Sequence, residues 1–389
     1  MKKPSLLFLT SRFPFPLEKG DKLRAYNLIR ALSKDFDIQL FSLAEHQPSE
    51  QDLRAVEPYC AAVRTVVVPQ WKCAINMLRQ PGIPFQVAYF TDMHAMKVLR
   101  EFVSAVSPTY VFCHLIRMAE YARGISGIRA IDYMDAFSTG MHRYAEQCPS
   151  LIKPFARIEA SRLDTYEAKV FPWFQAHFII SEQDRNLIPH PNRNQIQVVR
   201  NGIDTEYFHP VEQAKSFDLL FNGHMSYPPN IASAKFSATQ ILPELRKIRP
   251  AATLLIAGAN PGREIQSLQG NGVTVRGWMD DIREAFGCSR ILVAPMLISI
   301  GLQNKILQAM AMRIPCVISS LANNALEAKP GSEVLVADTP EQYAHQIESL
   351  LSNHDLYQQV AEAGYRYVLR RFNWTQEAVI IRESLFAQD

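Results

Sequence analysis

Short apolar runs alternate with longer stretches of helical periodicity through the first half of the chain. Each run is apolar at almost every position, which is typical of strands buried on both faces of a parallel sheet. The stretches between them have the helical period, and such helices cover the two faces of the sheet. The pattern predicts strands at residues 5–10, 37–43, 64–69, 109–115, 128–134 and 176–181, with helices that include 21–34, 94–106 and 154–174.

The same alternation restarts after the Asn201-Gly202 turn. A strand beginning at residue 196 leads into this turn and then into a linker that ends at Pro210. Later strands are predicted at 217–223, 252–259, 273–278, 290–295, 315–320 and 333–338, and two helices at 355–371 and 374–386 close the chain. The second half is therefore expected to be another doubly wound α/β unit.

The restart divides the chain into domains. We predict Rossmann-like domains over residues 1–196 and 197–371, and a C-terminal helix within 372–389 that packs back on the N-terminal domain. Ligands of open α/β sheets bind beyond the carboxyl ends of the strands. Two such domains are expected to face each other across a cleft that contains the site.

The composition indicates a globular cytoplasmic protein. The chain has 389 residues, of which 48% are apolar and 20% charged, and its net charge of +3 implies no nucleic-acid partner. Six cysteines without a CxxC pair indicate reduced thiols, with neither a disulfide framework nor a zinc site. The apolar run Leu6–Leu9 is too short for a signal peptide, and no segment approaches the roughly 20 apolar residues of a membrane span.

Basic residues are concentrated in the N-terminal half. Residues 1–195 contain 24 Lys and Arg against 19 Asp and Glu, whereas the remainder contains 17 against 19. This excess suits an anionic surface such as the inner leaflet of a bacterial membrane, although scattered solvated side chains would give the same count. One helical stretch either contacts lipid or a lipid-linked acceptor, or packs in the core with its basic side chains reaching solvent. Its residues are Trp71, Lys72, Ile75, Leu78 and Arg79.

Two predicted helices begin with a glycine that follows a strand. Gly20 precedes the first helix, and Gly301 opens a helix with Asn304, Lys305 and Gln308 on its first two turns. The free N–H groups and the dipole of such a helix end attract an anion. An ammonium group there suits a diphosphate, and an amide one turn deeper suits sugar hydroxyls. A polar helix start facing solvent is the alternative, but the apolar residues after Lys305 leave little room for a solvated flank.

The segment that begins at Lys305 resembles a family signature. "KILQAMAMRIPCVIS" is similar to the K-[IVL]-L-E-A-M-A-x-G-x-P-V-V motif of the retaining glycosyltransferases of family 4, which have the GT-B architecture of two facing Rossmann-like domains. Further similar segments span nearly the whole chain: "RFPFPLEKGDKLRAYNLIRAL", "RNGIDTEYFHP", "FNGHMSYPPNIASAKF", "LLIAGANP", "VRGWMDDIREAF" and "FNW". The "YPPN" and "DYMDAFS" segments most resemble the bacterial sugar transferases associated with exosortase and exopolysaccharide loci.

The resemblance implies roles for individual residues. Lys305 would hold the diphosphate of a nucleotide-sugar donor, and Gln308 stands where the family has the glutamate that binds the ribose hydroxyls. Asp135 would face the transferred sugar and the acceptor from the N-terminal, acceptor-side domain, with His114 and Ser138 as further candidates. Asp135 and Lys305 are thus the expected catalytic residues. The expected donor-binding residues are Gly20, Gly223, His224, Gly301, Leu302, Asn304 and Gln308.

The chain departs from the family pattern at three positions. The two glutamates of the family, eight residues apart, correspond to Ile300 and Gln308, so both carboxylates are missing. Arg313 occupies the position of the glycine that follows "AMA". A neutral amide can still bond a diol, but more weakly than a carboxylate. These changes bear on turnover more than on the fold.

No metal or other cofactor is expected. The sequence has no DxD motif, so the charge on the leaving diphosphate would be stabilised by Lys305 and two helix N-termini. No paired acid and nucleophile is apparent. We expect attack by the acceptor hydroxyl on the same face as the leaving group, with the leaving phosphate taking the proton and Asp135 orienting the reactants.

The sequence therefore predicts a metal-independent retaining glycosyltransferase of the hexosyltransferase type. It would move a sugar from a nucleotide-diphosphate donor to a polysaccharide or lipid-linked acceptor in cell-surface polysaccharide biosynthesis, with a possible peripheral contact to the inner face of the cytoplasmic membrane. A catalytically weak nucleotide-sugar-binding homologue and a sugar-nucleotide epimerase of the same fold are the alternatives. The sequence does not identify the sugar, the base, the acceptor or the oligomeric state.

Overall fold

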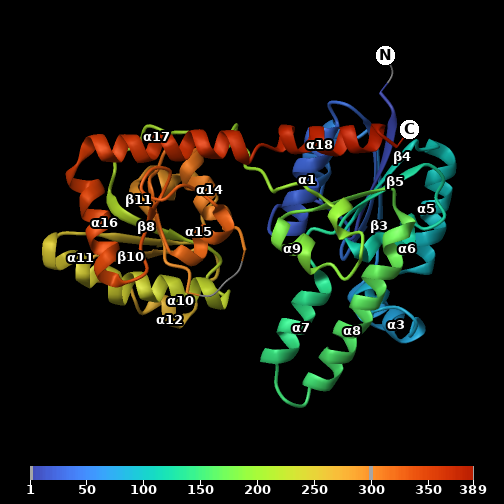
Figure 1. Cartoon of the computed structure of the whole chain (residues 1–389), viewed down its shortest axis with the longest axis horizontal. Helices are drawn as coiled ribbons and strands as arrows, with labels where there is room; N and C mark the ends of the chain where they lie inside the picture. The colour runs from blue at the N-terminus through green and yellow to red at the C-terminus, as the bar shows by residue number, and fades with distance from the viewer. Residues whose placement is uncertain (1–2, 298–300, 389) are drawn as a thin grey trace. The chain divides into compact units, whose positions relative to one another are not determined.

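The computed structural model describes residues 3–297 and 301–388. The chain forms two compact units, Met1–Gly202 with Trp374–Asp389 (unit 1) and Ile203–Asn373 (unit 2). Each unit is a parallel sheet with helices on both faces (Figure 1). The α/β fold class with two Rossmann-like units is therefore confirmed.

Unit 1 contains a seven-stranded parallel sheet in the order β3-β2-β1-β4-β5-β6-β7. Its strands are β1 (Ser5–Thr10), β2 (Asp37–Ala44), β3 (Ala62–Val67), β4 (Tyr110–His114), β5 (Ile128–Asp132), β6 (Ala176–Ile179) and β7 (Gln197–Val198). Its helices are α1 (Gly20–Leu32), α2 (Glu50–Val56), α3 (Gln70–Arg79), α4 (Phe85–Phe90), α5 (Met93–Val106), α6 (Ala119–Ala122), α7 (Phe137–Gln147), α8 (Lys153–Val170), α9 (Glu182–Leu187) and α18 (Trp374–Phe386).

The apolar runs form strands because both faces of the sheet are covered. Side chains alternate between faces along a strand. In β1, Leu7 and Leu9 join one buried cluster, whereas Leu6 and Phe8 join another on the opposite face. Helix α18 contributes Trp374 and residues beyond it to the second of these clusters.

Unit 2 contains a six-stranded parallel sheet in the order β10-β9-β8-β11-β12-β13. Its strands are β8 (Phe217–Asn222), β9 (Leu254–Ala257), β10 (Val273–Arg276), β11 (Ser289–Ala294), β12 (Cys316–Ile318) and β13 (Leu335–Val336). Its helices are α10 (Pro228–Phe236), α11 (Leu242–Ile248), α12 (Arg263–Gln266), α13 (Arg283–Gly287), α14 (Asn304–Ala311), α15 (Ser320–Leu326), α16 (Pro340–Ser352) and α17 (His354–Arg371).

The strand order in each unit reverses at one place. In unit 1 the first strand, β1, lies between β2 and β4, and in unit 2 the first strand, β8, lies between β9 and β11. The crevice beyond the carboxyl ends of the two strands at such a switch point is the usual ligand site of the fold. The loops after β1 and β4, and those after β8 and β11, are therefore the places to look for function.

The chain crosses between the units a few residues beyond the expected boundaries. It leaves unit 1 after Gly202 and returns after Asn373. A Cβ atom on Gly202 would lie 2.6 Å from the backbone nitrogen of Trp374, so the two crossings pack closely and only a residue without a side chain fits. In the described part of the chain, no helix is both long and apolar enough to cross a bilayer.

Candidate active site

Lys305 lies at the switch point of unit 2. It is the second residue of α14, which follows β11, and its side chain is only 7% exposed. The Lys305 Nζ donates a hydrogen bond to Asn230 Oδ1 at 2.7 Å and lies 4.4 Å from the centre of the Phe221 ring. Phe221 is in β8 and Asn230 in α10, so three elements around the switch point hold this one cation.

No described carboxylate neutralises Lys305. Burial lowers the pKa of its ammonium group to about 7, and no nearby charge contributes to that shift. A buried ammonium group is costly without a partner of opposite charge. The contacts with an amide oxygen and an aromatic face offset only part of this cost. The arrangement is thus suited to an anion that supplies the missing charge.

A glycine makes this arrangement possible. Gly223 follows β8, and a Cβ atom there would lie 2.7 Å from Asn230 Nδ2 and 3.1 Å from Lys305 Nζ. Asn230 Nδ2 also donates to the His224 carbonyl at 3.1 Å, which fixes the amide with its oxygen toward Lys305. The structure therefore brings Gly223, the His224 backbone and Lys305 together. The His224 side chain is exposed and instead contacts Ser226 at 2.8 Å.

The helix that carries Lys305 begins later than the sequence predicted. Gly301 does not open α14, because its φ of +66° is left-handed and the helix starts at Asn304 with Gln303 as its N-cap. Gly301 is exposed, and Leu302 packs against the core of unit 2. Asn304 and Gln308 are half-buried at positions one residue before and three residues after Lys305. Ile300, where the family has its first glutamate, lies outside the described residues.

Arg313 follows the C-terminus of α14 in a conformation that favours glycine. Its φ is +53°, as expected at a helix end where the resembling family has glycine. The side chain forms an ion pair with Glu362 at 3.0 Å and stacks over Tyr365. The arginine therefore replaces the glycine at some cost in backbone strain but gains contacts with α17, away from the first turn of α14.

A buried ionic cluster lies at the switch point of unit 1. Arg24 in α1 is fully buried and forms two hydrogen bonds to Asp132, at 2.7 and 2.9 Å, while its third contact is Asn201 at 2.8 Å. His114 Nδ1 lies 3.0 Å from Asp132 Oδ2, and His114 Nε2 lies 3.0 Å from the Asp21 carbonyl oxygen. Burial by itself would raise the pKa of Asp132, but Arg24 and His114 together hold it well below its usual range.

This cluster changes the interpretation of His114. Its ring is 2% exposed, and its two nitrogens lie within hydrogen-bond distance of the Asp132 carboxylate and the Asp21 carbonyl oxygen. A ring held in this way links β4, β5 and the start of α1. His114 therefore lies at the predicted strand end, but in the structure its ring positions α1 and has no free nitrogen for a sugar.

Asp135 and Ser138 lie in different environments although they are three residues apart. Strand β5 ends at Asp132, so Asp135 lies in the following loop and not at the strand end as expected. Its side chain reaches solvent, yet desolvation and the carboxylate of Asp184 raise its pKa to about 6. Ser138 is 1% exposed and donates to Glu167 at 2.6 Å, so its hydroxyl already has a partner within the protein.

Two arginines at this edge of unit 1 were missed by the sequence analysis. Arg12 follows β1 and Arg117 follows β4, and their guanidinium carbons lie 5.4 and 5.1 Å from the centre of the Phe90 ring. Arg12 pairs with Asp21, which is the first acidic residue of α1, at 2.5 Å. The Nε atoms of both arginines are buried without a partner, and burial lowers the pKa of Arg117 to about 10. Their positions directly after two apolar runs were the available signal.

Gly20 begins α1 at the same edge. It is exposed, and a Cβ atom there would lie 3.2 Å from the flexible end of the Met134 side chain. Its φ is outside the left-handed region, so the backbone does not require a glycine here. Close approach of a ligand remains the predicted reason for this residue.

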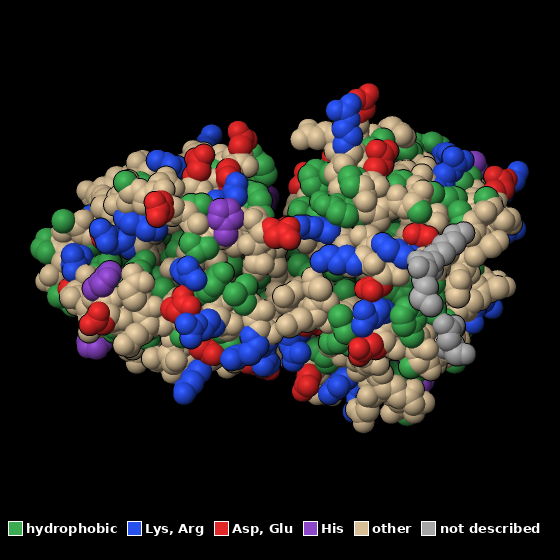
Figure 2. Space-filling view, turned by 90° about the horizontal axis from the view of Figure 1, so that it is seen from above, with side chains coloured by type: hydrophobic (Ala, Val, Ile, Leu, Met, Phe, Trp, Pro, Cys, Tyr) green, Lys and Arg blue, Asp and Glu red, His purple; other side chains and the backbone are tan. Residues whose placement is uncertain are grey.

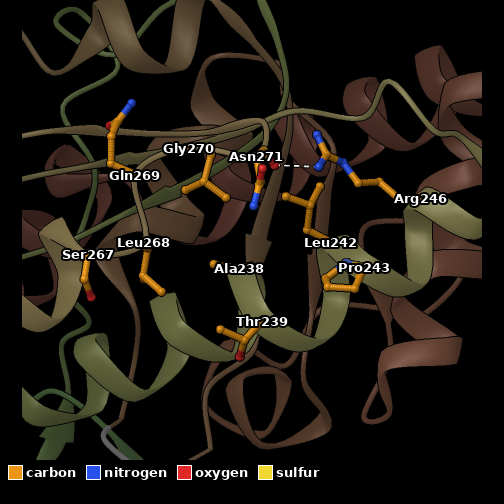
Figure 3. Close-up of a pocket in the computed structure, with 11 residues that line it drawn as sticks. Ala238, Thr239, Leu242, Pro243, Arg246, Ser267, Leu268, Gln269, Gly270 and Asn271 are labelled. Atoms are coloured by element: carbon orange, nitrogen blue, oxygen red, sulfur yellow. Dashed lines mark hydrogen bonds between the residues drawn. The ribbon is translucent and has the colours of Figure 1, made fainter.

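Unit 2 also contains a cavity of about 310 Å³ away from Lys305. Figure 3 shows it between Ala238–Arg246 on one side and Ser267–Asn271 on the other, with the Arg246 guanidinium bonded to the Asn271 carbonyl. These residues precede β9 and β10, so the cavity lies at the amino ends of the strands. Ligands of such sheets bind at the carboxyl ends, and the cavity is not part of the candidate site.

No metal site is evident in the part of the chain that the structure describes. Among residues 3–297 and 301–388, no three His, Cys, Asp or Glu side chains are placed to hold a metal ion together. On the face that Figure 2 shows, basic and acidic side chains are intermixed over both units.

Known proteins resemble the chain at the level of family and fold. Residues 216–353 match the family model for glycosyl transferases, group 1. Among solved structures, sucrose-phosphate synthase (tll1590) from Thermosynechococcus elongatus is 16% identical with a TM-score of 0.67, covering 99% of this chain and 100% of that chain. Alr3699/HepE from Anabaena, solved with UDP and also with UDP-glucose, is 12% identical in the UDP complex with a TM-score of 0.66, covering 98% and 100%.

An epimerase shares the fold as well. A putative UDP-N-acetylglucosamine 2-epimerase from Listeria monocytogenes is 12% identical with a TM-score of 0.60, covering 99% of this chain and 96% of that chain. No curated protein matches the sequence. At these identities the structural likeness establishes the fold, which is that of GT-B proteins. The family match, which includes Lys305 and Asn230, adds support for a group 1 glycosyltransferase.

Proposed function

We propose that this protein is a retaining, metal-independent glycosyltransferase of the hexosyltransferase type. It transfers a sugar from a nucleotide-diphosphate donor to a polysaccharide or lipid-linked acceptor during synthesis of a cell-surface polysaccharide. The proposal places it in the cytoplasm, in peripheral contact with the inner face of the cytoplasmic membrane. One observation carries it: Lys305 is buried with no carboxylate partner among residues 3–297 and 301–388, at the switch point of a unit that matches group 1 glycosyl transferases.

The donor diphosphate would supply the missing charge. A phosphate oxygen near Lys305 Nζ would form a charge-assisted hydrogen bond, while Asn230 keeps the ammonium group aimed at the site. The first turn of α14 adds backbone donors and a positive helix end. HepE, a neighbour with the same fold, was solved with UDP and with UDP-glucose. The donor proposed for this chain belongs to the same chemical class.

The chemistry follows from a donor held in this way. The acceptor hydroxyl oxygen forms a bond to the anomeric carbon on the face from which the diphosphate leaves, and the bond from that carbon to the diphosphate oxygen breaks. The hydroxyl proton passes to the leaving phosphate oxygen. Lys305 stabilises the charge that develops on the diphosphate. Asp135, whose pKa of about 6 leaves it ionised at pH 7, orients the sugar or the acceptor hydroxyl.

The direct test is an assay with a panel of nucleotide sugars, in the presence and absence of EDTA. We expect release of nucleoside diphosphate and transfer of the sugar with the anomeric configuration retained. Since Lys305 supplies the charge, EDTA is expected to leave the rate unchanged. A strict requirement for manganese or magnesium would contradict the metal-free mechanism. Conversion of the sugar without transfer would identify an epimerase, and binding without any reaction a nucleotide-sugar-binding homologue.

The amide of Gln308 provides a second test. Gln308→Glu is expected to tighten binding of nucleoside diphosphates several-fold, because a carboxylate accepts stronger hydrogen bonds from the ribose hydroxyls. Gln308→Ala is expected to weaken the same ligands. Calorimetric titration with matched ribo- and 2′,3′-dideoxy-diphosphates checks this, since the dideoxy forms should bind all three proteins alike. An equal effect on both ligand types would remove Gln308 from the ribose site.

A further inference from the structure

Unit 1 exposes large apolar side chains along two of its helices. On α3, Trp71 is 62% and Leu78 82% exposed, with Ile75 between them also exposed. The helix is anchored by Cys73 and Asn76, which are buried on its other side. Of the two interpretations that the sequence left open for this helix, packing of its apolar face in the core is therefore wrong.

A second exposed apolar stripe, which the sequence analysis did not single out, begins in the turn before α8 and continues onto the helix. Leu151, in the turn, is 89% exposed. On α8 itself Phe155 is 68% exposed, and Ile158, three residues later on the same face of the helix, is also exposed. Ala156 lies on another face and is buried in a small cluster with α7. The stripe thus remains uncovered although the helix is already packed against its neighbour.

Side-chain contacts join the two helices into one surface. The Arg162 guanidinium of α8 donates to the Pro81 carbonyl at 2.7 Å and stacks 4.6 Å from the Phe85 ring. The backbone N–H of Gln86 donates to Glu159 of α8 at 3.1 Å. The segment that follows α3 therefore packs on α8 one turn beyond Ile158. Figure 1 shows α3 beside α8, and the α7–α8 hairpin extending away from the sheet of unit 1.

We call this region the α3–α8 surface. Its apolar members are Trp71, Ile75, Leu78, Phe85, Leu151, Ile152, Phe155 and Ile158, all of them exposed. The two stretches that form it, residues 70–90 and 148–162, contain five Lys or Arg and a single acidic residue, Glu159, which is buried. The basic residues are Lys72, Arg79, Lys153, Arg157 and Arg162. Apolar side chains bordered by Lys and Arg are typical of helices that lie in a lipid interface.

We propose that the α3–α8 surface docks unit 1 on a bilayer that contains anionic lipid. The apolar side chains enter the boundary between headgroups and acyl chains, while the basic side chains contact lipid phosphates. On α3 the two kinds of side chain are neighbours, since the Lys72 ammonium group lies 5.5 Å from the centre of the exposed Trp71 ring. This surface deepens the proposed function, because it lets the enzyme reach an acceptor held in the membrane, but lipid binding itself requires no donor chemistry.

Charge favours a membrane over a second copy of the chain. A symmetric dimer through this surface would bring the same five basic side chains of both copies together with no exposed acidic partner in the surface. Like charges facing each other oppose association. An anionic bilayer instead complements Lys72, Arg79, Lys153 and Arg157, whereas Arg162 already pairs with Glu159. Exposed apolar patches of this kind mark either a membrane or a protein contact, and the charge decides between the two here.

The experiment is flotation of the full chain with vesicles of phosphatidylcholine alone or with 30% phosphatidylglycerol. We expect binding to the anionic vesicles that weakens as salt is added. Phe155→Ser combined with Leu151→Ser is expected to lower the partition coefficient at least tenfold. Lys153→Gln combined with Arg157→Gln should lower it roughly fivefold per charge on anionic vesicles, and leave any binding to neutral vesicles unchanged.

Ile248→Ser is the matched control, because Ile248 is 58% exposed in unit 2 and lies outside the α3–α8 surface. All variants should keep the thermal midpoint of the wild type and its affinity for nucleoside diphosphate, which excludes misfolding. Absence of wild-type binding to anionic vesicles, or unchanged binding after Phe155→Ser and Leu151→Ser, would overturn the proposal. So would a wild-type dimer in sedimentation that these substitutions dissociate. Vesicle binding without nucleoside diphosphate binding would instead reject the proposed donor site and leave the lipid surface standing.

Discussion

Lys305→Ala is expected to weaken binding of a nucleoside diphosphate by roughly tenfold to a hundredfold, the loss of one charge-assisted contact worth about 1.5–3 kcal/mol. Binding of the nucleoside without phosphates should change far less, because the ammonium group lies where the diphosphate is proposed to bind. Calorimetric titration of both ligands measures the difference. Lys329→Ala is the matched control, since Lys329 is an exposed lysine of the same unit.

The pH dependence provides a sharper test of the same contact. The pKa of Lys305 is lowered to about 7 by burial, whereas a bound diphosphate would raise it again by supplying an opposite charge. Above pH 7 the free protein must therefore take up a proton to bind. We expect the affinity to fall by up to about tenfold per pH unit between pH 7.5 and 8.5, a range in which the phosphates are already ionised.

The Lys305→Ala variant shows whether the pH dependence of diphosphate binding comes from Lys305 or from another titrating group. Lys305→Ala has no ammonium group to protonate, so its weak binding should be nearly independent of pH over the same range. Titrations in two buffers of different ionisation enthalpy should detect up to about one proton taken up per wild-type site. If the wild type binds as tightly at pH 8.5 as at pH 7.5, or Lys305→Ala binds like the wild type, the helix start is an ordinary polar surface.

The burial of Lys305 could be predicted from its own neighbours, whereas its partner could not. Apolar residues on both sides of α14 leave no solvated flank, which identified a lysine turned inward. Asn230 lies 75 residues earlier, and its contact depends on β8 and β11 being adjacent. That adjacency is a property of the strand order. A segment of sequence shows that strands exist, but not which of them pair.

The same reason explains what the sequence analysis missed in unit 1. His114 was singled out at the end of a predicted strand, and in the structure it is the last residue of β4. Ser138 was singled out as part of the "DYMDAFS" segment, and in the structure it lies in the first turn of α7. Their carboxylate partners, Asp132 and Glu167, lie 18 and 29 residues away and occupy the groups that a ligand would need. A buried partner is fixed by tertiary packing. The sequence therefore identified the right region of unit 1 but overestimated the number of side chains there that are free to bind a ligand.

Local backbone conformation accounts for the other differences. The start of α14 shifted from Gly301 to Asn304 because a residue with φ of +66° is not helical, and the loop continues to the N-cap Gln303.

The exposed stripe of α8 was missed because apolar residues at helical spacing usually mark a core face. The helical spacing of apolar residues is the same whether the face that they form is covered by another element or exposed to solvent. Only the packing of α7 on the other side of α8 shows which face remains open.

Asp132→Asn is expected to lower the free energy of unfolding of unit 1 by about 3–5 kcal/mol, the usual cost of removing one partner from a buried ionic group. Asp132 accepts two hydrogen bonds from Arg24 and one from His114 and is fully buried. An asparagine offers one oxygen, and its NH₂ group would face a donor of Arg24 or His114. The substitution leaves two buried donors without partners in addition to removing the charge.

Urea unfolding followed by tryptophan fluorescence is a suitable measurement, because Trp71, Trp173 and Trp374 lie in unit 1 and only Trp278 lies in unit 2. Glu50→Gln is the control, a carboxylate-to-amide change at a side chain that is 86% exposed, and should change stability by less than about 1 kcal/mol. A loss below 1 kcal/mol in Asp132→Asn would mean that the ionic cluster adds little to the fold.

The pH dependence of the stability loss in Asp132→Asn shows whether the loss comes from the missing charge or from a steric defect. The pKa of Asp132 is depressed in the folded protein, so its contribution is present above the unfolded pKa of about 4 and disappears as the pH falls toward the folded value. The asparagine variant has no such contribution at any pH. The two proteins should therefore approach each other in stability below about pH 4, whereas a purely steric defect would keep the difference in their stability constant.

Because His114 and Arg24 tie the start of α1 to β4 and β5, the same substitution should also loosen Arg12 and Asp21 at the edge where the acceptor is proposed to bind.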